Sequence, residues 1–247
     1  MRELDARAVR RVSFELEQLA EQTNSLAILD VGAGTGRYAE AVVHGVSKRT
    51  GLRYRGVAYD AIPEMLRGGP AHQPKDTGGM DRAIGFAEFL PFAAQSFSAV
   101  LSFNAVHHFD LPAFLAEAAR VVRLKGRLIL YTRTPEQNQR TIWGQLFPHF
   151  AERETRLYSK STLRAALGAI TDFESIELRE MQWTIRTSLS RLLEQARSGG
   201  YSTFRFYSAD EFEEALDTFE IRVRATFDDP AAITAQNDHL LVLAPRR

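Results

Sequence analysis

The sequence of 247 residues contains no cysteine, which excludes disulfide bonds, thiolate catalysis and metal sites with cysteine ligands. An excess of one charge is also missing, because 31 Lys and Arg residues balance 31 Asp and Glu residues. A chain without net charge has no global field that attracts it to nucleic acid or anionic lipid, and we expect no nucleic acid as a partner; a local basic patch stays compatible with this balance. Its 16 glycines, 9 prolines and 45% hydrophobic residues are typical of a globular protein and exclude large-scale disorder.

Long hydrophobic runs are absent as well, since no segment approaches the roughly 18 apolar residues of a membrane span. The first 23 residues carry too many charges for a secretory signal, and their apolar spacing predicts an amphipathic helix over residues 4–22. We therefore expect a cytoplasmic protein. The histidines show neither H-x-E nor H-E-x-x-H spacing, and we expect no metal site.

The first half of the chain alternates short apolar runs with helical patterns. Strands are predicted at residues 26–31, 55–60, 82–86, 98–103 and 127–132, and helices follow them from about residue 37, over 61–66 and over 111–122. Strands and helices that alternate at this spacing indicate βαβ units and a mostly parallel, doubly wound α/β sheet.

The second half is less regular. Helices are predicted over 137–150, 161–169, 188–197 and 209–219, the last after a capping box formed by Ser208 and Glu211, and strands over 177–185 and 239–243. We expect one domain of 247 residues that comprises an N-terminal helix (1–24), a core (25–135), a helical cap with a late strand (136–236) and a closing strand (237–247).

Five residues after the first predicted strand, Gly32-Ala33-Gly34-Thr35-Gly36, form a glycine-rich turn that lets a ligand approach the backbone. A tight turn without a ligand is the alternative interpretation. The dinucleotide fingerprint G-x-G-x-x-G requires glycine at position 37, where Arg37 stands. Asp30 precedes the turn, and a carboxylate there favours a cationic ligand over a pyrophosphate.

A second carboxylate, Asp60, ends the second predicted strand. In nucleotide-binding α/β folds a carboxylate at this place accepts hydrogen bonds from ribose hydroxyls, although Asp60 taken alone could equally be a helix N-cap. Its pairing with the glycine-rich turn favours the ribose role.

Five motifs in order resemble those of class I, Rossmann-like S-adenosylmethionine-dependent methyltransferases, in the subgroup similar to the ubiquinone and menaquinone biosynthesis enzymes. They are Asp30 to Gly36, Gly56 to Asp60 with Met65-Leu66, Gly85 to Phe92 with Ser96 to Val100, Asn104 to Phe109, and Glu117 to Gly126. The resemblance covers residues 26–133. It implies a seven-stranded, mostly parallel sheet with helices on both faces and a small helical cap, and S-adenosylmethionine as cofactor, with S-adenosylhomocysteine as product.

The resemblance also implies cofactor-binding positions. The backbone of the glycine-rich turn is expected near the amino-acid part of S-adenosylmethionine, as are Asn104 and Ala105, which would lie near its methionine moiety. Asp60 is expected near the ribose, and Ala61, Ala87 and Glu88 near the adenine. The full set of expected cofactor-binding residues is Asp30, Gly32, Ala33, Gly34, Gly36, Asp60, Ala61, Ala87, Glu88, Asn104 and Ala105. One departure concerns adenine, because Phe86 stands where the family often has Asp or Asn. Two other departures are Ser98, where the family usually has Asp, and the turn Lys125-Gly126-Arg127, where the family usually has Pro-Gly-Gly.

Catalysis of methyl transfer needs in-line orientation, and a general base only when the nucleophile arrives protonated. His107 and His108 follow the fourth predicted strand; we name His108 as the candidate base, against the alternative of two ordinary loop histidines. Arg197 and Tyr201 flank the Gly199-Gly200 break and are candidate substrate-binding residues. Aromatic residues gather in this half, as a wall of an acceptor pocket or simply as the core of the cap.

The leading hypothesis is an enzyme that methylates a small or medium-sized organic acceptor. The alternatives are an RNA or protein methyltransferase, which predicts a basic groove, a non-catalytic cofactor-binding member of the fold, which Phe86 keeps open, and an NAD-dependent oxidoreductase, which Arg37 disfavours. The sequence specifies neither the acceptor nor the oligomeric state.

Overall fold

The structure, a computed structural model, describes residues 4–23, 26–68 and 78–247, and these residues form two compact units. The sheet unit comprises residues 4–132, 160–179 and 241–247, apart from the stretches not described. The helical unit comprises residues 133–159 and 180–240.

Seven strands form one sheet in the order β3-β2-β1-β4-β5-β7-β6. Their bounds are β1 Leu26–Val31, β2 Tyr54–Asp60, β3 Gly78–Ile84, β4 Phe97–Phe103, β5 Val122–Thr132, β6 Glu177–Thr187 and β7 Ile233–Pro245. The pairs β1–β2, β1–β4, β2–β3 and β4–β5 are parallel. The predicted fold class is confirmed, and the strand order reverses between β1 and β4, where open α/β sheets bind ligands at their carboxyl edge.

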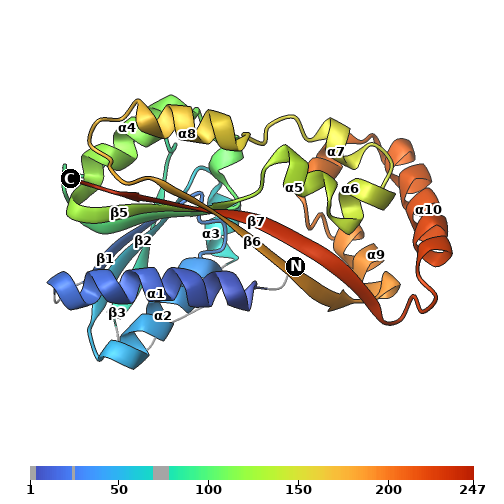
Figure 1. Cartoon of the computed structure of the whole chain (residues 1–247), viewed down its shortest axis with the longest axis horizontal. Helices are drawn as coiled ribbons and strands as arrows, with labels where there is room; N and C mark the ends of the chain where they lie inside the picture. The colour runs from blue at the N-terminus through green and yellow to red at the C-terminus, as the bar shows by residue number, and fades with distance from the viewer. Residues whose placement is uncertain (1–3, 24–25, 69–77) are drawn as a thin grey trace. The chain divides into compact units, whose positions relative to one another are not determined.

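Helices cover both faces of the sheet within the sheet unit. Figure 1 shows α1 (Ala6–Thr23) and α2 (Arg37–Thr50) on one face and α4 (Leu111–Val121) and α8 (Lys160–Gly168) on the other, while α3 (Pro63–Arg67) follows β2. Helix α1 buries Ala8, Val12 and Leu16, which recur at helical spacing. The predicted helix over 4–22 is therefore confirmed with its bounds shifted by one or two residues.

The helical unit contains α5 (Pro135–Gln139), α6 (Ile142–Leu146), α7 (Phe150–Arg153), α9 (Leu189–Arg197), the 3-10 turn η2 (Ser202–Phe206) and α10 (Ala209–Thr226). The single helix predicted over 137–150 is wrong. Thr134 and Thr141 cap separate helices, each accepting a hydrogen bond from a backbone N–H three residues on, and His149 adopts a left-handed φ of 59°. These threonines compete for backbone N–H groups that a continuous helix would use.

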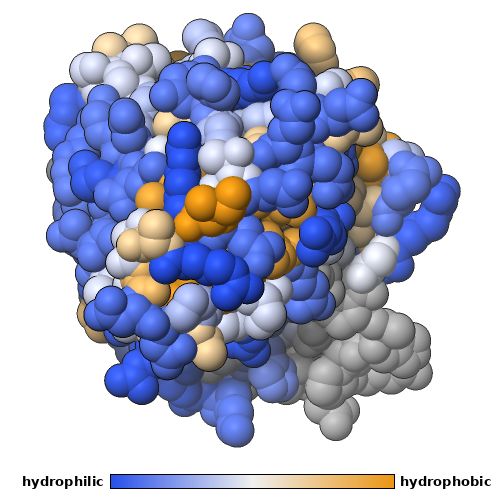
Figure 2. Space-filling view, turned by 90° about the vertical axis from the view of Figure 1, so that its right-hand side faces the viewer, coloured by the Kyte–Doolittle hydropathy of each residue, from blue (hydrophilic) through white to orange (hydrophobic). Residues whose placement is uncertain are grey.

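Aromatic rings form the core of the helical unit. Trp143 stacks on Phe219 with ring centroids 4.8 Å apart, and Phe147, Phe150 and Phe204 pack around this pair. Figure 2, which views the side where Figure 1 draws α10, shows hydrophilic side chains over most of that face and a few apolar ones near its centre. The aromatic residues are thus mainly core, as the alternative interpretation held.

Several predicted bounds need correction. The third strand was predicted to end at Phe86 but ends at Ile84, and the fifth begins at Val122 instead of residue 127. Helix α10 continues to Thr226 and β7 begins at Ile233, both longer than predicted. Charged residues interrupt the apolar pattern in these stretches, and pairing with neighbouring strands or packing on the aromatic core decides their conformation. The capping box of Ser208 and Glu211 is confirmed.

Candidate functional site

The glycine-rich turn joins β1 to α2 at the carboxyl edge of the sheet. Gly32, Gly34 and Gly36 have left-handed φ angles of 68°, 57° and 77°. The N–H groups of Gly32 and Ala33 both donate to the Tyr59 carbonyl, at 2.8 and 3.1 Å, which holds the turn against the end of β2. The glycines are required here because other residues adopt this backbone conformation at a cost.

Close approach imposes a second requirement on this turn. A Cβ atom added to Gly32 would lie 2.5 Å from the Cβ of Ala105 and 2.7 Å from Cζ of Phe109. Both neighbours follow β4, so the turn lies directly against the segment after the neighbouring strand. The structure therefore brings the predicted residues of the first and fourth motifs together.

Asp60 connects the same turn to the end of β2. Its Oδ2 accepts a hydrogen bond from the Gly34 N–H at 2.7 Å, and its Oδ1 accepts from the Ile62 N–H at 2.9 Å. A carboxylate offers about four lone-pair sites, so each oxygen keeps capacity for a further donor. Asp60 is 9% exposed, and it both organises the turn and presents an anionic edge beside it.

Asp30 lies on β1 immediately before the turn and is 1% exposed. Its Oδ1 has no hydrogen-bond partner among the described residues. Burial raises the pKa of this carboxyl well above its ordinary value, and the nearby Asp60 charge raises the pKa further. A cation next to this pair of acids would counter both effects, whereas a polyphosphate would add to them.

The segment after β4 is held in a strained conformation. Asn104 has a left-handed φ of 53°, which is uncommon for a residue with a side chain, and its N–H donates to the Tyr131 carbonyl of β5 at 2.7 Å. Ala105 follows and is buried against the glycine-rich turn. The segment after β4 is thus held both to β5 and to the glycine-rich turn.

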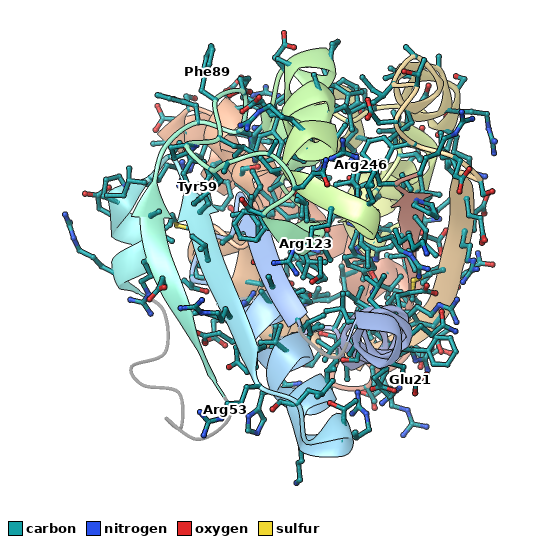
Figure 3. The ribbon with its side chains drawn as sticks, turned by 90° about the vertical axis from the view of Figure 1, so that its left-hand side faces the viewer. Glu21, Arg53, Tyr59, Phe89, Arg123 and Arg246 are labelled. Atoms are coloured by element: carbon teal, nitrogen blue, oxygen red, sulfur yellow. The ribbon has the colours of Figure 1, made fainter. Side chains whose placement is uncertain are left out.

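The loop after β3 carries the third motif. The Tyr59 hydroxyl donates to the carbonyls of Phe89 and Phe86, at 3.1 and 3.4 Å, and Figure 3 shows Phe89 projecting away from the strands. Ala87 is buried and the Glu88 carboxylate accepts a hydrogen bond from the Asp110 N–H. The Phe86 side chain is 67% exposed, so it does not fill the interior of the sheet unit. Ala61, at the end of β2, is exposed as well.

The two candidate histidines form a 3-10 turn, η1 (Val106–His108), after β4. Their ring centroids lie 4.1 Å apart, with His107 half-buried and His108 exposed. The candidate substrate residues lie in the helical unit, where Tyr201 packs against Trp143 and Phe150, and Arg197 ends α9 as an exposed residue.

Within the part of the chain that the structure describes, no three His, Cys, Asp or Glu side chains come together to hold a metal ion. No helix of these described residues is long and apolar enough to span a membrane. The helical unit has a cavity of about 560 Å³ lined by Arg186, Thr187, Ser188, Arg191, Ala231, Ala232 and Thr234.

The sequence analysis missed two residues that the structure emphasises. Tyr59 supplies both the carbonyl that holds the glycine-rich turn and the hydroxyl that holds the loop after β3. Arg133, directly after β5, is 6% exposed although it carries a charge. The only sequence signal for Arg133 was a charged residue at the carboxyl end of an apolar strand.

Comparison with known proteins gives consistent matches. Residues 29–130 match a family described as a methyltransferase domain. A methyltransferase of Mycobacterium tuberculosis is 29% identical over 174 residues, which is 70% of this chain and 64% of that relative, less than two thirds of its length. The demethylmenaquinone methyltransferase of Thermobifida fusca is 37% identical over 109 residues, 42% of each chain.

Solved structures match over almost the whole chain. The YcgJ protein of Bacillus subtilis has a TM-score of 0.61 at 23% identity and covers 96% of this chain and 99% of that chain. Loganic acid methyltransferase with SAH has a TM-score of 0.68 at 14% identity, over 97% of this chain and 92% of that chain. At these identities the likeness shows the fold.

Proposed function

Because residues 29–130 match a family described as a methyltransferase domain, we propose that this chain transfers a methyl group from S-adenosylmethionine to a small or medium-sized organic acceptor. The observation that carries the proposal is the joint placement of the glycine-rich turn, Asp60 and the segment after β4 at one edge of the sheet. The cofactor supplies an electrophilic methyl group on a sulfonium ion.

The residues present fit this cofactor. Gly32 lets the glycine-rich turn lie directly against the segment after β4, and Asp60 retains lone pairs for two ribose hydroxyls. Asp30 and Asp60 are acids beside the turn, which favours a ligand that carries an ammonium group and a sulfonium ion over a dinucleotide with its anionic pyrophosphate. Gly34, Gly36 and Ala33 would line the amino-acid part of the cofactor through their backbone; Asn104, Ala105, Ala61, Ala87 and Glu88 complete the proposed set.

Catalysis would then depend mainly on orientation, which can remove about 7–11 kcal/mol from a barrier. His108 is exposed just after β4 and is our candidate to take a proton from an acceptor that arrives protonated. Arg197 and Tyr201 remain candidates for acceptor binding. Phe86 provides no acceptor for the adenine amino group, so backbone carbonyls of the loop would have to serve.

The test is calorimetric titration of S-adenosylhomocysteine into the wild type, Asp60→Ala and Asp81→Ala. Asp81 is an exposed carboxylate on the neighbouring strand β3 and provides the matched control. We expect micromolar binding by the wild type and the control, and a loss of about 1–3 kcal/mol in Asp60→Ala, the cost of removing a charged hydrogen-bond partner. A folded wild type that does not bind would contradict the proposal.

Binding alone does not separate an enzyme from a cofactor-binding protein. The folded wild type is therefore incubated with S-adenosylmethionine labelled at its methyl group and a protein-free small-molecule extract of cells. Transfer of label to a small molecule supports the enzyme, whereas binding without transfer supports the non-catalytic alternative.

A further inference from the structure

Arg133 is a buried cation at the end of β5. Its Nε donates to the Asp238 carbonyl at 2.9 Å, and its Nη2 donates to Oδ1 of Asn237 at 2.9 Å and lies 3.3 Å from Nε2 of His239. All four residues belong to the helical unit. The three partner atoms are uncharged, so the hydrogen bonds position the guanidinium without neutralising it.

The charges around Arg133 do not balance. Asp238, whose backbone carbonyl accepts from Arg133, is 1% exposed, and its carboxylate accepts from Nε of Arg140 at 2.6 Å and from Nε2 of Gln236 at 2.9 Å. Because an arginine nitrogen can only donate, His239 accepts through Nε2 and is neutral. Among the described carboxylates, none lies within ion-pair distance of Arg133. The cluster therefore keeps one positive charge.

A buried charge without a counter-ion is costly, and proteins keep such charges paired or use them to bind ligands. The guanidinium also has unused capacity. No described residue accepts a hydrogen bond from Nη1 of Arg133, so two of its five N–H groups remain for another partner. The ring of His239 is fixed by stacking on Trp183, with centroids 5.7 Å apart and planes 14° from parallel.

The position of Arg133 along the chain is also informative. It lies two residues beyond Tyr131, whose carbonyl accepts the Asn104 N–H. It directly follows Thr132, the last residue of β5. We propose that Arg133 binds the carboxylate of a small organic acid. The inference rests on the burial, the charge and the hydrogen bonds of Arg133, and it does not depend on the proposed function.

A matched control comes from the cavity of the helical unit. Arg186 lines that cavity and is exposed, so it is a second arginine of the same unit without the burial of Arg133. Arg133→Gln removes the buried charge and keeps a side-chain donor, and Arg186→Gln makes the same chemical change at the cavity.

The experiment measures thermal stabilisation by benzoate and octanoate against benzamide and octanamide, with sodium chloride added to the amides to equal ionic strength. A ligand that binds the folded state raises the melting temperature in a saturable manner. We expect the wild type and Arg186→Gln to bind the acids at least tenfold more tightly than the amides, and Arg133→Gln to lose this preference. The proposal would be overturned if the wild type does not bind the acids more tightly than the amides. It would also be overturned if Arg133→Gln keeps this preference for acids or if Arg186→Gln loses it.

Two further measurements keep the result interpretable. S-adenosylhomocysteine affinity is measured in all three proteins and is expected to agree within twofold, so that failure of the proposed function shows as no cofactor binding, separately from the acid preference. If Arg133→Gln does not fold, Arg133→Lys replaces it. Benzoate should then shift one ¹⁵N-arginine side-chain signal of the wild type, and that signal should be missing in Arg133→Lys; a shift confined to other signals contradicts the assignment.

Discussion

The sheet unit and the helical unit bury their apolar residues in different ways. Strands β1 and β4 are buried along almost their whole length, and aliphatic residues such as Ile28 and Val100 dominate there. The helical unit instead packs rings, with Trp143 and Phe219 at its centre. Continuous aliphatic runs identify strands in a sequence, whereas aromatic residues spread over short helices leave no single period. The comparison explains why one unit was predicted well and the other was not.

Removal of the central ring of the helical unit is expected to give the largest effect. Phe219→Ala should lower the free energy of unfolding by about 3–5 kcal/mol, because it deletes a fully buried ring. Both tryptophans, Trp143 and Trp183, belong to the helical unit, so urea denaturation followed by tryptophan fluorescence reports on that unit.

The control is Ile221→Ala on the same helix, where the side chain is 68% exposed and the expected change is small. The affinity of Phe219→Ala for S-adenosylhomocysteine should stay within twofold of the wild type, because the proposed cofactor residues all belong to the sheet unit. Equal losses of unfolding free energy in Phe219→Ala and Ile221→Ala would contradict an aromatic core centred on Phe219.

A pair of glycines tests close approach in the sheet unit. Gly32 and Gly51 have similar φ angles, 68° and 72°, but a Cβ at Gly51 would meet no atom within 4 Å. Gly51→Ala should cost only the backbone strain, about 1–2 kcal/mol. Gly32→Ala should cost that plus about 1–3 kcal/mol of overpacking against Ala105, and should weaken S-adenosylhomocysteine binding at least tenfold. Chemical denaturation and calorimetry measure both; similar binding by the two variants would show that close approach at Gly32 does not matter.

The smallest effect is a pH dependence at Asp30. Because its pKa is raised in the folded state, the folded protein binds the proton more tightly, and the contribution of this group to stability falls as pH rises above the ordinary value of 3.8. The slope for one group is at most about 1.4 kcal/mol per pH unit.

Asp30→Asn removes the titrating group, so the stability difference between the variant and the wild type should grow in favour of the variant as pH rises through the folded pKa. Denaturation curves at a series of pH values measure this difference. The exposed Asp81→Asn serves as control and should show no such trend. A wild type that gains stability relative to Asp30→Asn over this range would reverse the sign and refute the interpretation.

The sequence predicted the elements that are specified by residues close together along the chain. The strand over Leu26–Val31 and the capping box of Ser208 were predicted because the apolar run and the capping residues each lie within a few positions of the chain. It failed at residues 137–150, where apolar and aromatic residues recur at helical spacing but Thr134 and Thr141 begin separate helices. A side chain that caps a helix and one that merely lies within it look the same in a sequence.

The candidate site divides in the same way. The sequence by itself determined the glycine-rich turn, the acids Asp30 and Asp60 and their order along the chain, because turn conformation and charge are properties of the residues. Only the tertiary structure decided that Tyr59 holds both neighbouring loops, that Asp30 is buried beside Asp60, and that Arg133 is a buried cation among uncharged partners. Burial and the balance of charge depend on residues distant in the sequence, such as Asp238 from Arg133, and become defined only when folding brings them together.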